Sequence, residues 1–147
     1  MSTSARKNTS KIMVFGTFDG VHAGHLHFFR EARRLSTHPF LIVSIARDAN
    51  VRRIKGKRPR FGEKKRAALV KKTGLADKVV LGGLKNHIPH IIKERPDIVA
   101  LGYDQKAYVK NLKKDLALAG LPVILARLSP YKEKKYKNSI LLGKGGV

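Results

Sequence analysis

The sequence predicts an α/β fold: a Rossmann-like, doubly wound, five-stranded parallel sheet with helices on both faces. Short apolar runs alternate along the chain with segments of helical spacing, which is the rhythm of strand–helix–strand units. The apolar runs are continuous and do not alternate with polar residues, as expected for strands covered on both faces. The chain of 147 residues has room for one such domain.

Each element follows from a local pattern. The first strand is the apolar run at 12–15, and the first helix, 24–35, follows from apolar residues that recur every three positions from Leu26 to Leu35. Pro96 and Gly120 mark the ends of two later helices. The remaining expected strands are 39–46, 77–81, 97–101 and 121–128, and the remaining helices are 62–73, 88–94 and 103–119.

Loops and tails complete the organisation. Residues 47–61 are expected to form a basic loop, which contains Gly56 and Pro59. Residues 129–147 are expected to hold a second basic loop, a short helical turn at 138–142 and a glycine-rich end. The domain is expected to cover 11–142, with a disordered basic tail at 1–10 and a flexible tail at 143–147.

Composition narrows the class of protein. Without cysteine, the chain forms no disulfides and no thiolate metal site. No apolar run approaches the ~20 residues needed to cross a bilayer, and the polar N-terminus is no secretory signal, so a cytoplasmic protein without membrane insertion is expected. Lys and Arg number 32 against 10 acids, a formal charge of +22 that attracts polyanions and exceeds what a nucleotide site requires.

The loop after the first strand, GTFDGVHAGH at 16–25, contains the strongest candidates for functional residues, and we call it the histidine loop. Gly16 lets the backbone turn and approach a ligand. His22 and His25 place two imidazoles at the start of a helix, where free amides and the helix dipole favour phosphate, and Gly24 keeps the space between them open. Two other interpretations stay open at this point: half of a metal site, which needs a third ligand, and surface histidines without a role.

The same loop resembles the signature of the nucleotidylyltransferase superfamily, with its His-x-Gly-His element. Its Phe-Asp-Gly-Val-His portion is similar to the form in bacterial FAD synthetases, and the rest of the chain resembles the small archaeal-type FAD synthetases. The resembling stretches are 46–51, 55–59, 81–86 and 96–105, and together with the loop they cover nearly all of 11–142.

The resemblance implies a role for each matching residue. His22 and His25 would hold the triphosphate and stabilise the transition state, with Lys55 as a further catalytic cation. The nucleotide and its phosphates would be bound by Gly16, Thr17, Phe18, Gly24, Asp104, Lys137 and Ser139. The acceptor or ribose side would be formed by Asp19, Asp48 and Lys57. Lysine and a single serine at 137 and 139 depart from the arginine and Ser/Thr pair of the cytidylyltransferases.

The expected function is therefore transfer of a nucleoside monophosphate from a nucleoside triphosphate to a phosphorylated small acceptor, with release of pyrophosphate. FMN adenylyltransferase is the leading form, and a CTP-dependent enzyme acting on glycerol 3-phosphate or a phospho-amino-alcohol is the alternative. Mg²⁺ is expected to arrive with the triphosphate, so no protein metal ligand is assigned. The superfamily often forms homodimers. Charge alone also supports an RNA-binding module, against which the histidine loop argues.

Overall fold

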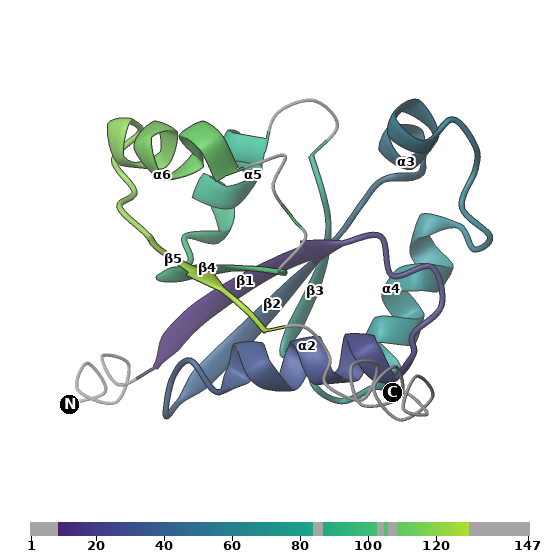
Figure 1. Cartoon of the computed structure of the whole chain (residues 1–147), viewed down its shortest axis with the longest axis horizontal. Coiled ribbons are helices and arrows are strands. Elements are labelled where there is room, and N and C mark those ends of the chain that lie inside the picture. Colours follow the sequence, from purple (N-terminus) through teal and green to yellow (C-terminus); the bar gives the residue numbers. More distant parts are fainter. Residues whose placement is uncertain (1–8, 84–86, 103–104, 106–108, 130–147) are drawn as a thin grey trace, which may run out of the picture.

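Five parallel strands form one sheet in the order β3-β2-β1-β4-β5 (Figure 1). The strands are β1 (Ser10–Gly16), β2 (Pro39–Ile45), β3 (Lys78–Leu81), β4 (Ile98–Leu101) and β5 (Ile124–Arg127). The computed structural model describes residues 9–83, 87–102, 105 and 109–129. The chain runs from β1 to β2 and β3 on one side and then returns to β4 and β5 on the other, so the strand order reverses beside β1. Ligands of such sheets bind at this reversal, beyond the carboxyl ends of the strands.

Two pairs of helices sandwich the sheet. The helices are α2 (Ala23–Arg33), α3 (Asp48–Lys55), α4 (Glu63–Lys72), α5 (His87–Glu94) and α6 (Val109–Leu118). Helices α2 and α4 bury Phe29, Ala32 and Val70 against one face, and α5 and α6 bury Ile91, Leu112 and Leu116 against the other. Helix α3 lies beyond the carboxyl end of the sheet (Figure 1).

Strand β1 shows why the apolar runs are continuous. Ile12 and Val14 are fully buried in the core on the α2 side, whereas Met13 and Phe15 point into the core on the α5 side. Since successive side chains of a strand point to opposite faces, a strand covered on both faces needs an apolar residue at every position. The predicted doubly wound parallel sheet is confirmed by this arrangement.

One expected loop is wrong in part. Residues 47–61 were expected to lack a helix, but 48–55 form α3. Val51 is the one buried residue of this helix, so it has no apolar stripe that periodicity could reveal. Gly56, at φ 78°, ends the helix in the left-handed conformation that glycine tolerates.

The boundaries of the described elements otherwise agree with expectation to within about three residues, except that the helix expected from 103 begins at Val109, since Gln105 is not helical. Strand β1 begins at Ser10, the last residue of the expected tail, and the Ser10 amide bonds the carbonyl of His38 at 3.0 Å. The expected turn at 138–142 and the tail at 143–147 lie outside the described residues. In the part of the chain that the structure describes, no helix combines the length and apolarity needed to span a membrane.

Candidate active site

The two histidines of the first loop cap the helix that follows them. The Nδ1 atom of His22, the N-cap residue of α2, accepts a hydrogen bond from the Gly24 amide at 3.1 Å. In return, the Nδ1 atom of His25 accepts from the His22 amide at 3.3 Å. The two rings stack with centroids 3.8 Å apart and planes inclined by 20°. The pair forms a capping box in which imidazoles replace the usual hydroxyl and carboxylate.

This cap determines which ring nitrogens carry protons. A neutral imidazole that accepts at Nδ1 holds its proton on Nε2, so Nε2–H is the donor of both His22 and His25, and an anion at His25 would share this donor with the Gly20 backbone. The Gly24 amide already donates to the His22 ring, and the His25 amide donates to the His22 carbonyl at 3.0 Å. The imidazoles, more than these two amides, are therefore the donors available to an anion at this end of α2.

His25 is held neutral. The pKa of His25 is lowered from 6.5 to about 4: burial is the largest cause, the neighbouring His22 adds to it, and a hydrogen bond to the Gly20 backbone opposes the shift. The ring of His25 also meets the ring of Phe18 edge-on, with centroids 5.2 Å apart. At neutral pH His25 is therefore an uncharged hydrogen-bond donor with a fixed orientation.

Phe18 fills the inside of the loop. Its side chain is 4% exposed and packs on Phe28 and Phe29, although its φ of 52° is unusual for a bulky residue. A Cβ atom on Gly16 would lie 2.5 Å from the Phe18 ring, so Gly16 makes room for this ring. The strained backbone of Phe18 is a feature that clusters at functional sites and persists where the surroundings determine it.

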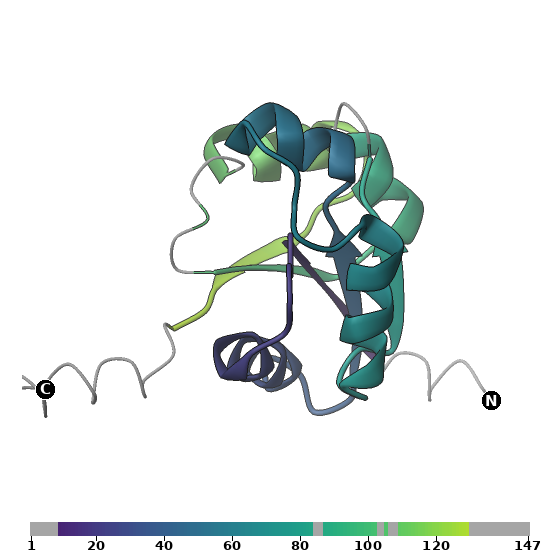
Figure 2. The same cartoon turned by 90° about the vertical axis from the view of Figure 1, so that its right-hand side faces the viewer.

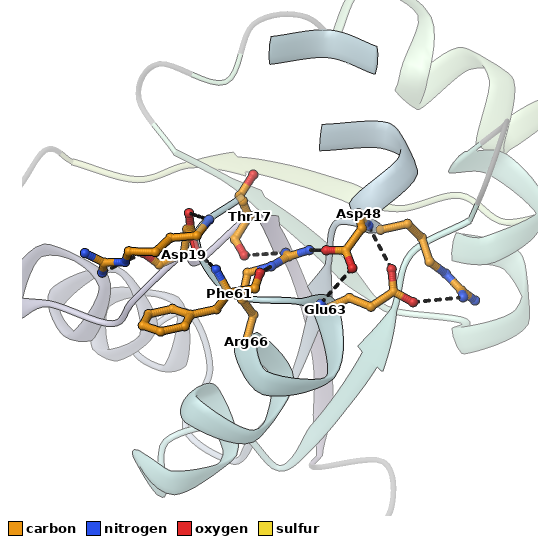
Figure 3. Close-up of polar contacts among 8 residues, drawn as sticks. Thr17, Asp19, Asp48, Phe61, Glu63 and Arg66 are labelled. Carbon is orange, nitrogen blue, oxygen red and sulfur yellow. Dashed lines mark hydrogen bonds and ion pairs between the residues drawn. The ribbon is translucent and has the colours of Figure 1, made fainter. Parts of the chain in front are cut away.

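Arg66 ties three segments together at the carboxyl end of the sheet. The side chain is fully buried, and its guanidinium donates to the Thr17 carbonyl at 2.8 Å, to the Asp48 Oδ1 atom at 2.6 Å and, through Nε, to the Phe61 carbonyl at 2.9 Å. Figure 3 shows Arg66 between Thr17 and Asp48. One buried cation from α4 thus fixes the backbone of the histidine loop relative to the start of α3.

Helices α3 and α4 cap each other. Neither Arg47 nor Gly62, their N-cap residues, provides a side-chain cap. Instead, the Asp48 amide donates to Glu63 Oε1 at 2.8 Å, and the Glu63 amide donates to Asp48 Oδ2 at 3.2 Å (Figure 3). Desolvation raises the pKa of Asp48, but the hydrogen bonds from Arg66 and the Glu63 amide lower it more, so its pKa lies below the ordinary value.

Asp19 anchors the segment that precedes α4. Its two carboxylate oxygens accept from the Arg60 amide at 2.6 Å and the Phe61 amide at 2.8 Å. Desolvation raises the pKa of Asp19, and these backbone hydrogen bonds outweigh it, so the net shift is downward. The carboxylate predicted for the acceptor or ribose side is therefore engaged in holding the loop 60–61 against the histidine loop.

Gln105 crosses the point where the strand order reverses. Its side-chain amide donates to the Phe15 carbonyl of β1 at 2.9 Å, and its oxygen accepts from the Gly102 amide after β4 at 2.8 Å. Arg127 at the end of β5 donates to the carbonyls of Gly102 and Gln105 at 2.8 and 3.1 Å. Beside this crossing lies a small apolar hollow lined by Phe15, His87, Ile91, Leu101 and Leu112.

Comparison with known proteins identifies the family. A family profile described as cytidylyltransferase-like matches residues 13–140. The chain belongs to the cytidylyltransferase-like family. A protein from Methanosarcina barkeri described as FAD synthase is 40% identical over 84% of this chain and 86% of its own, and one from Korarchaeum cryptofilum with the same description is 42% identical over 80% of each.

A solved structure extends the comparison of this cytidylyltransferase-like chain. The crystal structure described as the lipopolysaccharide core biosynthesis protein from Thermoplasma volcanium superposes with a TM-score of 0.76 and 35% sequence identity. The match covers 83% of this chain and 98% of that one. The resemblance to the nucleotidylyltransferases, first seen in the histidine loop, is thus confirmed and extends over most of the chain.

The predicted site residues of this family member fall into three groups. Gly16, Thr17, Phe18, Asp19, His22, Gly24 and His25 share the histidine loop, to which Arg66 joins Asp48. Lys55 and Lys57 are exposed at the end of α3, and no hydrogen bond or ion pair joins them to the histidine loop within the described ranges. Asp104, Lys137 and Ser139 lie outside the described residues.

Sequence reasoning missed Arg66 and Gln105. Arg66 stands among lysines in the sequence, yet it lies four residues before the buried Val70 and so shares its helix face. That spacing was a readable signal. Gln105 gave no comparable signal, because its role depends on strands β1 and β4 lying side by side.

Proposed function

We propose that this protein is an FMN adenylyltransferase that moves AMP from ATP to FMN and releases pyrophosphate. The observation that carries the proposal is the match to FAD synthases along at least 80% of both chains. The capped histidine pair supports it, since it places two donors at the helix start that follows β1. The different description of the Thermoplasma volcanium structure makes a sugar phosphate the acceptor to test against FMN.

The reaction is a direct displacement at phosphorus. An oxygen of the FMN phosphate forms a bond to the α-phosphorus of ATP while the bond from that phosphorus to the β-bridging oxygen breaks, and pyrophosphate leaves with the electron pair. The acceptor phosphate is already anionic near neutral pH, so no general base is required. The Nε2–H groups of His22 and His25 donate to oxygens that gain charge in the transition state. Because the two rings are already fixed, little reorganisation free energy is required during the reaction.

A divalent ion, with Mg²⁺ as the expected one, would neutralise the charge of the triphosphate. No group of three or more His, Cys, Asp or Glu side chains suited to a metal ion occurs in the part of the chain that the structure describes. The carboxylates of Asp19 and Asp48 already accept two hydrogen bonds each. These residues fit an ion that is carried by phosphates and water, as Mg²⁺ commonly is.

The apolar hollow beside Gln105 has room for little more than a water molecule, so only the edge of the acceptor's apolar part would meet its wall. It adjoins the reversal of strand order, where ligands of this fold bind, and its wall includes the half-buried His87, whose pKa burial lowers. A His87→Ala variant should raise KM for FMN more than KM for ATP. Equal changes in the two KM values would show that the hollow does not contact the acceptor.

The decisive experiment measures pyrophosphate release. Purified protein with Mg²⁺ is given ATP or CTP together with FMN, glycerol 3-phosphate, phosphocholine, phosphoethanolamine or a hexose phosphate, and the products are separated by chromatography. We expect FAD to form with ATP and FMN. Pyrophosphate with CTP and a phosphorylated alcohol, or with a sugar phosphate alone, would overturn the choice of substrates and keep the chemistry.

Matched histidine variants test the site itself. His22→Ala and His25→Ala should each lower kcat by roughly 10²–10³, the usual loss for one transition-state donor. His38→Ala is the control, because His38 is exposed at the opposite end of β2 and its substitution should leave kcat unchanged. Light scattering would test the expected homodimer, and cell fractionation would test the expected cytoplasmic location.

A further inference from the structure

The exposed cations of residues 52–72 gather along one edge of the molecule. This basic edge runs over α3, the following loop and α4, which face the viewer in Figure 2. It consists of Arg52, Arg53, Lys55, Lys57, Arg58, Arg60, Lys64, Lys65, Lys71 and Lys72, all of them exposed. None of these side chains forms an ion pair with another residue that the structure describes.

Few of the described acids offset the basic edge: Asp19 interacts with Arg60 and Asp48 with Arg52, and both carboxylates are also held by hydrogen bonds within the fold. Glu63 pairs with Arg47, and Asp48 pairs with the buried Arg66. The described carboxylates that accept hydrogen bonds or form ion pairs within the fold are Asp19, Glu31, Asp48, Glu63, Asp77, Glu94 and Asp97. Most of the surplus positive charge of the sequence therefore remains uncompensated on the surface.

Helix α4 arranges part of this charge as a stripe. At 100° per residue, Lys64, Lys65, Lys71 and Lys72 fall on one side of the helix, opposite the buried Arg66 and Val70. The two lysine pairs are separated by about 10 Å along the axis, at ~1.5 Å per residue. Since α4 runs back against the strand direction, Lys71 and Lys72 lie toward the opposite end of the sheet from the histidine loop.

We infer that the basic edge binds the phosphate backbone of a nucleic acid without regard to base sequence, in addition to the nucleotidyl transfer. A bound mononucleotide at the histidine loop does not reach the far end of α4, whereas a polymer of phosphates engages the whole stripe. The edge has one aromatic side chain, Phe61, and Arg60 and Lys65 already lie over its ring at 4.7 and 5.8 Å. Backbone contact without stacked bases gives affinity without sequence preference.

A membrane surface fits the edge less well. Helices that lie on membranes combine cations with a broad apolar face. Within residues 48–72, Ile54 is the large apolar side chain that is exposed, at 68%. One such side chain among ten cations favours a hydrated polyanion over a lipid surface.

The test compares two triple variants of the full chain by fluorescence anisotropy. Lys64→Gln/Lys71→Gln/Lys72→Gln removes three of the four charges of the stripe. Lys93→Gln/Lys113→Gln/Lys114→Gln removes the same charge from exposed lysines of α5 and α6, on the other side of the molecule (Figure 1). The probes are a labelled mixed-sequence 20-nucleotide RNA and a DNA duplex of equal length, titrated between 50 and 200 mM salt.

We expect the stripe variant to bind both nucleic acids at least tenfold more weakly at 100 mM salt and to lose about 2–3 units of the slope of log K against log salt, at ~0.7–0.9 per phosphate contact. The control variant should keep the affinity and slope of the unmodified protein to within about twofold. Saturating ATP and FMN should not displace the RNA, and pyrophosphate release by the stripe variant should be unchanged.

Three results would overturn the inference. Equal losses in both triple variants would mean that net charge, and not the edge, attracts nucleic acid. Displacement of RNA by ATP would place binding at the nucleotide site. Binding to vesicles containing anionic lipid, without binding to either nucleic acid, would show that the basic edge binds a membrane surface and not a nucleic acid. Because nucleic-acid affinity and pyrophosphate release are measured separately, failure of this inference is distinct from failure of the adenylyltransferase proposal.

Discussion

Replacing Arg66 with methionine removes the buried guanidinium while keeping most of the side-chain volume. Three hydrogen bonds disappear, to the carbonyls of Thr17 and Phe61 and to the Asp48 carboxylate. A cost of ~3–5 kcal/mol is usual when one partner of a buried ion pair is removed. Asp48 is 40% exposed, so water can hydrate its carboxylate again and the cost falls to the lower end of that range. We therefore expect the free energy of unfolding to drop by ~3 kcal/mol.

The loss is measurable by urea denaturation and by thermal melting. For a domain of this size, ~3 kcal/mol corresponds to a Tm lower by roughly 6–12 °C. Arg52→Met is the matched control, because Arg52 is exposed and its substitution should change stability by less than about 0.5 kcal/mol. Lysine at position 66 should rescue little, since an ammonium group does not reproduce the three directions of the guanidinium.

A double-mutant cycle with Asp48→Asn isolates the ion pair. If Arg66 and Asp48 interact as the 2.6 Å contact indicates, the two substitutions together should cost at least about 1 kcal/mol less than the sum of the single costs. The stability gained from Asp48 ionisation, which is lost as the pH falls through its lowered pKa, should shrink in Arg66→Met. Strict additivity, or a loss in Arg66→Met below ~1 kcal/mol, would refute the account of Arg66 as a buried anchor.

Three further substitutions in the histidine loop give distinct readouts. Between pH 6.5 and about 4 the unfolded His25 takes up a proton that the folded ring resists, so His25 should lower stability by ~1–2 kcal/mol as the pH drops through this window, a value reduced for partial exposure. In denaturant titrations His25→Asn should reduce the slope of stability against pH, and the slope that remains is expected from His87 and His90, whose pKa values burial also lowers. Gly16→Ala, whose Cβ would meet the Phe18 ring at 2.5 Å, should cost ~1–3 kcal/mol by urea denaturation, and an unchanged midpoint would contradict the close packing. Asp19→Ala frees the Arg60 amide, so trypsin should cleave after Arg60 several-fold faster, whereas an unchanged rate would show that Asp19 does not hold this segment.

Sequence reasoning succeeded where the signal was local. Apolar runs and helical spacing located the strands and most helices, because the period of burial follows directly from strand and helix geometry. It failed at α3, because Val51 is the one buried residue of this helix and leaves no apolar stripe in the sequence. In addition, the first amide of α3 is capped by Glu63 from another helix, which no local pattern shows. The histidine loop was found because its residues are contiguous in the chain.

By itself, the sequence determined the parallel α/β class, the histidine loop and the excess of positive charge, since each is written in contiguous residues or in composition. Tertiary structure alone decided that His22 and His25 cap one another and hold their protons on Nε2. It also decided that Arg66, one of the eleven cations in residues 52–72, is buried and anchors Thr17 and Asp48, while the other ten remain at the surface. The physical reason is that a hydrogen bond between distant segments depends on how the strands and helices pack, and no local pattern records which carbonyl or carboxylate a side chain will meet.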